Sequence, residues 1–377
     1  MTAGLHDADV LIVGGGPAGS SCAWALVRAG LRVTVLDKAS FPRDKPCAGW
    51  ITPQIVTAVE LDVEQYRQGR VWQPVYGFRC GMIGGPEIAV RYQEPISFGI
   101  RRCEFDTYLL QRSGARLVLN CPVRRLERHG TRWVINEQWT APMLVGAGGH
   151  FCPVARQLDA RRSCRPLVTA QEVEYRAPPE VAEQSQVEPD MPEIFFCQDL
   201  KGYGWCFRKE LFFNVGLGRL DAQHLPAHVS EFCQELAKRG KVPASFPVAF
   251  RGHAYVVYEQ VAPRLVDEGV VLVGDAAGLA YGRSGEGIRP AVESGLLAAR
   301  TIMECQGDFS AKNLEAYTER ITERFGRPRP NRRWLPDSWL CGLARWLLQQ
   351  RWFARHVVMD RWFLHRQQPP LVNLSYR

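Results

Sequence analysis

Short apolar runs and helical stretches alternate at the start of the chain. Residues 10–13 are all apolar, which is typical of a buried parallel strand. Residues 18–29 have the composition of a helix, and residues 32–36 form a second apolar strand that ends at Asp37. A strand, a helix and a strand in this order predict a parallel sheet covered by helices.

The middle of the chain has a different pattern. Its apolar segments are short, and glycine or proline residues separate them, which is typical of an antiparallel sheet. We expect strands at residues 71–73, 87–92, 167–173, 193–197, 203–208 and 211–218. We expect helices at residues 227–239, 288–305 and 314–325. The chain has no internal repeat and no low-complexity segment.

A glycine motif follows the first strand directly and has the form Gly14-x-Gly16-x-x-Gly19. In dinucleotide-binding turns the first glycine makes the turn, the second lets the backbone approach a diphosphate, and the third lets helix and strand pack closely. The phosphates then lie at the helix N-terminus. Asp37 follows the motif by roughly 20 residues, where a ribose-binding carboxylate is expected. The segment therefore predicts a dinucleotide site.

Two further glycine segments extend this site. Residues 145–149 read Val-Gly-Ala-Gly-Gly, and residues 271–278 read Val-Leu-Val-Gly-Asp-Ala-Ala-Gly. With the first motif they fit the three parts of one flavin site, so we expect FAD as the cofactor. The fold class predicted is α/β with an α+β insertion: a Rossmann-like FAD-binding domain, an antiparallel-sheet substrate domain and a helical C-terminal region.

The length of 377 residues exceeds that of one typical domain. The boundaries we expect divide the chain into a discontinuous FAD-binding domain, two insertions that form the substrate domain, and a C-terminal region. These are residues 1–70, 99–165 and 259–310 for the first, 71–98 and 166–258 for the second, and 311–377 for the third.

Composition places the chain among soluble globular proteins, with 46% apolar and 23% charged residues. The first residues lack the pattern of a signal peptide, and no run of about 18 apolar residues occurs, so we expect a cytoplasmic protein. The twelve cysteines show neither C-x-x-C pairs nor metal-type spacing. They predict reduced thiols and no metal site.

The C-terminal residues 326–377 carry the excess charge. They contain ten arginines, no lysine and two aspartates, a net charge of +8 that equals that of the whole chain. Apolar side chains recur there at near-helical spacing, at Trp339, Leu343, Trp346, Phe353 and Val357, with arginines between them. Such a helix packs on the body of the protein or lies on the inner, anionic face of a membrane. No base-reading module accompanies the charge, so no nucleic acid is expected.

Four segments together resemble the geranylgeranyl reductase branch of the flavoproteins that share the p-hydroxybenzoate hydroxylase fold, over about residues 9–300. Besides the first glycine motif, residues 41–49 resemble P-R-x-K-x-C-G, residues 100–106 resemble R-x-x-F-D, residues 274–278 with 284–288 resemble G-D-A-A-G…G-E-G-I, and residues 202–207 resemble Y-x-W-x-F-P. Two departures occur: Gly148 replaces an acid that helps bind NADPH in the hydroxylases, and Arg208 replaces a proline, where it would meet an anionic head group or solvent.

The resemblance implies roles for individual residues. Asp275 would hold a ribityl hydroxyl, backbone N–H groups near Gly287 would face the flavin pyrimidine, and Arg102 would contact the flavin. The full cofactor-binding set is Gly14, Gly16, Pro17, Ala18, Gly19, Asp37, Lys38, Arg43, Cys47, Ala48, Arg102, Val123, Ala147, Gly148, Gly274, Asp275, Gly285, Gly287 and Ile288. Cys47 is also expected beside the reacting atoms, with Tyr203 and Trp205, which share one side of a strand.

The activity implied is reduction of carbon–carbon double bonds in a hydrophobic, isoprenoid-like small molecule or lipid, by hydride transfer from reduced FAD. Two alternatives remain: an FAD monooxygenase that hydroxylates an aromatic or polyketide-like compound, and a membrane-associated flavoprotein that passes electrons to a quinone. The electron donor is NAD(P)H or a ferredoxin-like carrier.

Overall fold

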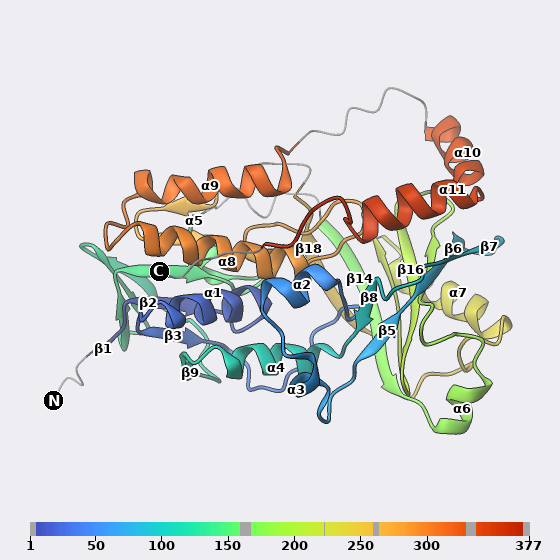
Figure 1. Cartoon of the computed structure of the whole chain (residues 1–377), viewed down its shortest axis with the longest axis horizontal. Coiled ribbons are helices and arrows are strands. Elements are labelled where there is room, and N and C mark those ends of the chain that lie inside the picture. The colour runs from blue at the N-terminus through green and yellow to red at the C-terminus, as the bar shows by residue number, and fades with distance from the viewer. Residues whose placement is uncertain (1–4, 159–166, 222, 259–263, 329–336, 372–377) are drawn as a thin grey trace.

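The computed structural model describes residues 5–158, 167–221, 223–258, 264–328 and 337–371. A six-stranded sheet with its helices lies at one end of the molecule and a seven-stranded sheet lies at the other (Figure 1). This arrangement confirms the predicted fold class. The domain boundaries drawn from the sequence remain a prediction.

The six-stranded sheet is parallel except for one edge strand. In spatial order its strands are β19 (Val266–Asp267), β20 (Val270–Leu272), β13 (Met143–Gly146), β2 (Val10–Val13), β3 (Val33–Leu36) and β9 (Arg116–Val118). The four strands β20, β13, β2 and β3 are buried at every position, which explains their continuous apolar sequences. The two strands predicted at the start of the chain are its central pair, β2 and β3.

Helices pack against this sheet and against one another. They are α1 (Pro17–Arg28), α2 (Pro53–Ala58), α3 (Val63–Arg67), α4 (Arg102–Arg112), α5 (Pro153–Leu158), α8 (Ile288–Glu304) and α9 (Ala311–Phe325), together with η2 (Gly274–Ala276), a 3-10 helix of one turn. Helices α1 and α8 approach closely because Gly295 has no side chain: a Cβ there would lie 2.3 Å from the Ala18 carbonyl oxygen. This contact fixes the N-terminal end of α1.

The structure also contains two small sheets, and only part of one of them was predicted from the sequence. The first consists of β1 (His6–Asp7), β12 (Trp139–Ala141), β11 (Arg132–Ile135) and β10 (Leu126–His129). The second consists of β4 (Trp50–Ile51), β8 (Ser97–Gly99) and β5 (Gln73–Val75). The strand expected at residues 71–73 is therefore displaced toward β5. The Val71 backbone N–H instead donates to a Glu104 carboxylate oxygen at 2.8 Å, which ties this residue to α4.

The seven-stranded sheet is built from residues of both predicted insertions. In spatial order it contains β18 (Arg251–Val256), β14 (Leu167–Arg176), β17 (Phe212–Arg219), β16 (Gly202–Lys209), β15 (Glu193–Phe196), β6 (Gly77–Met82) and β7 (Glu87–Arg91). All pairs are antiparallel except β6 with β15. The expectation of an antiparallel sheet is wrong for that pair, because a long excursion of the chain, and no hairpin, joins the two strands.

The two faces of this sheet have different partners. One face packs on α7 (Leu225–Lys238) and α6 (Pro179–Gln184) through a cluster that includes Val173, Phe213 and Phe232. The other face carries Phe78, Trp205 and Phe207 and faces the C-terminal helices. Successive side chains of each strand point to these two faces in turn.

The C-terminal region is helical but contains a break. Helix α10 (Asp337–Leu348) ends before Gln350, which is extended, and α11 (Arg351–Phe353) continues into the wide π-helix η3 (Ala354–Phe363). These helices lie beside the seven-stranded sheet (Figure 1). Leu348, Val358 and Phe363 are buried against it, so the inner side of the region packs on the body of the protein. The side chains of Trp334 and Trp339 lie outside the described residues.

Candidate active site

A cavity of about 550 Å³ lies where the two large sheets meet. One part is lined by the residues that end β2, β3 and β13, which is the carboxyl edge of the parallel sheet, where ligands of such sheets bind. The other part is lined by Ala170, Tyr203 and Trp205 of the seven-stranded sheet. Its size falls within the range of small-molecule and cofactor sites.

The turn between β2 and α1 has the geometry of a diphosphate cradle. Gly14 has a φ of +111°, and a Cβ on it would lie 2.4 Å from the Ala147 carbonyl oxygen. A Cβ on Gly19 would lie 1.9 Å from the Gly14 carbonyl oxygen, so the turn closes only with glycine at both positions. Helix α1 begins at Pro17 without a side-chain cap or an acidic residue in its first turn. Its free N–H groups and the nearby Arg43 guanidinium suit an anion.

Asp37 lies at the end of β3, on the cavity wall, as expected. Its carboxylate accepts hydrogen bonds from the backbone N–H groups of Gly15 at 2.7 Å and Ala39 at 2.9 Å. The carboxylate therefore fixes the glycine turn as well as facing the cavity. Lys38 and Val123 line the same end of the cavity.

A buried charged cluster stands beside Cys47. Arg102, the first residue of α4, makes two hydrogen bonds of 2.8 Å to the Asp106 carboxylate, and Arg43 lies 3.3 Å from the same carboxylate. Burial opposes ionisation of Asp106, but the two guanidinium groups hold its pKa below the ordinary value. Cys47 lines the cavity beside these two arginines. The arrangement brings the predicted residues Arg43, Cys47 and Arg102 to one wall.

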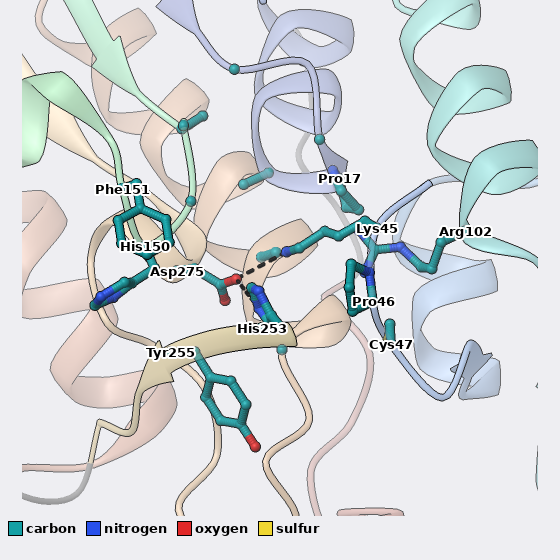
Figure 2. A pocket seen from close by; sticks show the side chains of 18 of the residues that line it. Pro17, Lys45, Pro46, Cys47, Arg102, His150, Phe151, His253, Tyr255 and Asp275 are labelled. Carbon is teal, nitrogen blue, oxygen red and sulfur yellow. Dashed lines mark hydrogen bonds and ion pairs between the residues drawn. The ribbon is translucent and has the colours of Figure 1, made fainter. Parts of the chain in front are cut away.

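A second cluster of charged side chains also lines the cavity. Figure 2 shows Lys45 and His253 converging on Asp275, with Nζ of Lys45 at 3.0 Å and Nε2 of His253 at 3.8 Å from Oδ2. Burial opposes ionisation of Asp275, but these two groups hold its pKa well below the ordinary value. Burial in turn lowers the pKa of His253, against the influence of Asp275. Asp275 is therefore an ionised acceptor that faces the cavity, which suits a sugar or ribityl hydroxyl.

The far wall is aromatic. The Tyr203 hydroxyl donates to the Ser284 carbonyl oxygen, and the Trp205 indole N–H donates to the Asn214 side-chain oxygen at 2.7 Å. Gly216 leaves room for the Trp205 ring, since a Cβ there would lie 2.3 Å from Cζ2. The Phe363 ring lies 5.4 Å from that of Tyr203, which extends the apolar wall into the C-terminal helices.

The structure brings nearly all of the predicted site residues to this one cavity. The exceptions are Gly19 and Gly274, which do not line it and instead allow close packing behind it: a Cβ on Gly274 would lie 3.0 Å from that of Ala18. Arg208 is not among the lining residues. Its Nε donates to the Glu210 carbonyl oxygen at 3.1 Å, because it points to the opposite face of β16 from Trp205. Of the two alternatives for Arg208, an anionic head group or solvent, the structure therefore favours solvent.

Sequence reasoning missed several residues of the cavity, namely Glu172, His253 and Tyr255. Glu172 had a signal: it occupies an inward position of the strand β14, next to Ala170, where an apolar residue is the rule. Burial raises the pKa of Glu172 to about 7 and that of Glu286, also on the cavity wall, to about 7. Among the described residues, no group of three or more His, Cys, Asp or Glu is arranged to bind a metal ion.

Comparison with known proteins agrees with this geometry. Residues 9–75 match the family of FAD dependent oxidoreductases. The chain is 29% identical to menaquinone reductase of Mycobacterium tuberculosis (85% of this chain, 81% of that protein) and 27% identical to geranylgeranyl diphosphate reductase of Rhodobacter capsulatus (78% and 75%). A geranylgeranyl bacteriochlorophyll reductase-like structure from Thermoplasma acidophilum superposes with a TM-score of 0.73 at 20% identity, over 99% of this chain and 95% of that one. These matches confirm the resemblance drawn from the motifs, and FAD is the cofactor.

Proposed function

We propose that this FAD-dependent oxidoreductase, a relative of the geranylgeranyl reductases, saturates carbon–carbon double bonds of a hydrophobic, isoprenoid-like substrate. The observation that carries the proposal is the continuity of the cavity. It runs from a glycine cradle for a diphosphate to a wall of large aromatic side chains. Bound FAD supplies the hydride when reduced, and the protein supplies position, shape and electrostatics.

We propose a role in FAD binding for the residues of each wall. The N-terminus of α1 with Arg43 would hold the diphosphate, and Asp37 would hold the adenosine ribose. Asp275 would accept from a ribityl hydroxyl. Arg102 and Cys47 would then lie beside the ring system, next to the part of the cavity that the seven-stranded sheet lines.

The substrate would bind between the ring and the aromatic wall. Trp50, Tyr203 and Trp205 line this part of the cavity, and the Tyr203 hydroxyl and the Trp205 indole N–H both have protein partners. Such a wall excludes water and offers apolar area to a hydrocarbon chain.

The test is an anaerobic turnover assay with geranylgeranyl diphosphate as the probe and dithionite as the reductant, which makes the result independent of the natural donor, whether NAD(P)H or a ferredoxin-like carrier. Mass spectrometry should show the gain of two hydrogen atoms for each saturated bond. In a parallel aerobic assay with NAD(P)H, a substrate-dependent consumption of oxygen with a hydroxylated product would instead establish the monooxygenase. If the bound flavin is reduced and reoxidised but the probe gains no hydrogen, the proposed reductase activity is refuted.

A quinone acceptor is the second candidate, favoured by the similarity to menaquinone reductase. Menaquinone should then be added anaerobically to protein whose flavin has been reduced and separated from excess dithionite, because dithionite reduces quinones directly. Reduction of the quinone ring without any gain of hydrogen in the side chain would support electron transfer to a quinone. Saturation of the side chain would support the reductase.

We further propose that the outer side of the C-terminal helices lies on an anionic membrane surface on the cytoplasmic side. Leu343, Trp346 and Trp352 expose 51%, 58% and 66% of their surface, although each is large and apolar. Arg351 lies exposed beside Trp352. Aromatic side chains flanked by arginines suit the interface of an anionic bilayer. No helix among the described residues has the length and apolar character needed to cross a bilayer.

Co-flotation with vesicles tests this membrane contact. Wild-type protein should float with vesicles that contain phosphatidylserine, and a variant with Trp346→Ser and Trp352→Ser should not. Val248→Ser is the matched control, since Val248 is 49% exposed but lies outside the C-terminal region. Equal flotation of the double variant would contradict the proposal.

A further inference from the structure

One carboxyl group stands on the substrate side of the cavity without an assigned role. Glu172 is only 7% exposed and lines the cavity together with Ala170, two residues earlier on the same face of β14. Farther along the same face, Glu174 is engaged in an ion pair with Lys209. A buried carboxyl on a cavity wall is costly unless it is hydrogen-bonded, neutral or both.

Asn214 holds this carboxyl in place. The side-chain oxygen of Asn214 accepts the Trp205 indole N–H at 2.7 Å, which fixes the orientation of the amide. Its nitrogen then donates to Oε2 of Glu172 at 3.1 Å and to the Cys47 carbonyl oxygen at 3.0 Å. The array therefore links the aromatic wall, the carboxyl and the segment that carries Cys47.

The charges around Glu172 are committed elsewhere. The ammonium of Lys209 is bound by Glu174 at 2.5 Å and donates to two backbone carbonyl oxygens. Arg251 is the β18 residue paired with Glu172 across the sheet. Its side chain is exposed and binds Asp44 at 2.9 Å. Next to it on β18, His253 is engaged with Asp275. Burial therefore dominates and raises the pKa of Glu172 to about 7, so the protonated carboxyl is accessible near neutral pH.

Saturation of an isolated double bond requires such a proton. A carbon–carbon double bond that is not conjugated to a carbonyl cannot store the negative charge of an added hydride. The proton must therefore arrive with the hydride or before it, from an acid that contacts the substrate. The acid must be neutral when the substrate binds and must lie on the substrate side of the cavity.

We propose that Glu172 is the proton donor of the reaction and that Asn214 is the residue that positions it. This inference rests on the proposed reductase function. In the step, one alkene carbon receives the hydride that the reduced cofactor supplies, and the other receives the proton of the Glu172 carboxylic acid. The double bond becomes a single bond with two added hydrogens, the cofactor is oxidised, and the carboxylate regains its proton from solvent.

The first experiment needs no turnover. Infrared difference spectra recorded across pH 5 to 9 on the purified, FAD-loaded protein should show a protonated-carboxyl band that disappears near pH 7. The Glu172→Gln variant should lose a large part of that band, and Glu286, whose pKa is also raised to about 7, should contribute to the remainder. Glu286→Gln is the matched comparison, because it removes the other cavity carboxyl of raised pKa and leaves the Asn214 array intact. A band that persists in Glu172→Gln and vanishes in Glu286→Gln would overturn the assignment.

The second experiment measures anaerobic turnover of geranylgeranyl diphosphate. Glu172→Gln should bind FAD normally and reduce turnover by about 100-fold or more, as expected for loss of a general acid. Asn214→Leu should retain more activity but shift the pH profile upward, because the amide hydrogen bond lowers the pKa of Glu172. Full activity of Glu172→Gln would overturn this inference only. A wild-type protein that leaves the probe unsaturated would overturn the proposed function, and the proton-donor role with it.

Discussion

Removal of the Glu293 charge should release the C-terminal segment from the body of the protein. Glu293 lies on α8, and its Oε1 binds the fully buried Arg289 at 2.9 Å. Arg324 donates to the same carboxylate at 2.8 and 2.6 Å. The two arginines also donate to the backbone carbonyl oxygens of His365, Gln368 and Pro369. One carboxylate thus organises two cations that hold the chain after η3.

Glu293→Gln preserves shape and removes the charge. It leaves two buried or largely buried guanidinium groups near each other without a counter-ion, and loss of one partner from a buried ion pair costs about 3–5 kcal/mol. Glu304→Gln on the same helix is the control. Glu304 is also four residues after its arginine, Arg300, but the two side chains are 47% and 51% exposed. Its replacement should cost about 0–1 kcal/mol.

The assay is urea unfolding followed by tryptophan fluorescence, with both variants and wild type in the same FAD concentration. The free energies come from the midpoints and a shared m-value. Limited proteolysis should also cut Glu293→Gln in the C-terminal region before any other site. If the two glutamines differ by less than about 1 kcal/mol, the buried cluster does not hold this segment, and the reasoning from burial is wrong.

Two further predictions concern the cofactor turn and the pH dependence. Gly19→Ala places a Cβ within 1.9 Å of the Gly14 carbonyl oxygen and should cost about 1–3 kcal/mol of FAD affinity, measured as lost flavin absorbance. Gly342→Ala is the control, because a Cβ there meets nothing within 4 Å, and it should keep its flavin. Equal flavin content in the two variants would contradict the close-packing argument. Burial and the Arg289 cation lower the pKa of His365 to about 4, so the unfolded chain binds this proton more tightly and stability should fall as pH drops from about 6.5 to about 4, by at most ~3 kcal/mol. His365→Asn should flatten the urea midpoint over that window, and an unchanged slope would exclude the residue as the source.

The FAD half of the site was predicted from sequence because its determinants are local. The turn of Gly14 and Gly19 lies within one strand–turn–helix unit, and its chemistry requires glycine at fixed spacing. Asp37 follows at the end of the next strand, so its place is set by the same unit. The segments at 145–149 and 271–278 could be added because β13 and β20 are buried parallel strands with continuous apolar sequences.

The rest of the site depends on contacts between distant segments. Lys45 and Asp275 are 230 residues apart, and no local pattern links them. The Asn214 array joins three strands and the Cys47 segment. The parallel pairing of β6 with β15 depends on how the chain returns from the six-stranded sheet, not on the sequence of either strand.

The sequence by itself determined the nucleotide-binding framework and the cofactor, because backbone turns and strand burial leave a regular local pattern. Only the tertiary structure decided which side chains face the substrate. It turned Arg208 away from the cavity, enclosed Glu172 within it, and placed Phe363 against the aromatic wall. Burial of a side chain is a property of everything packed around it, so the charge state and reactivity of a group such as Glu172 become readable only once distant strands have been brought together.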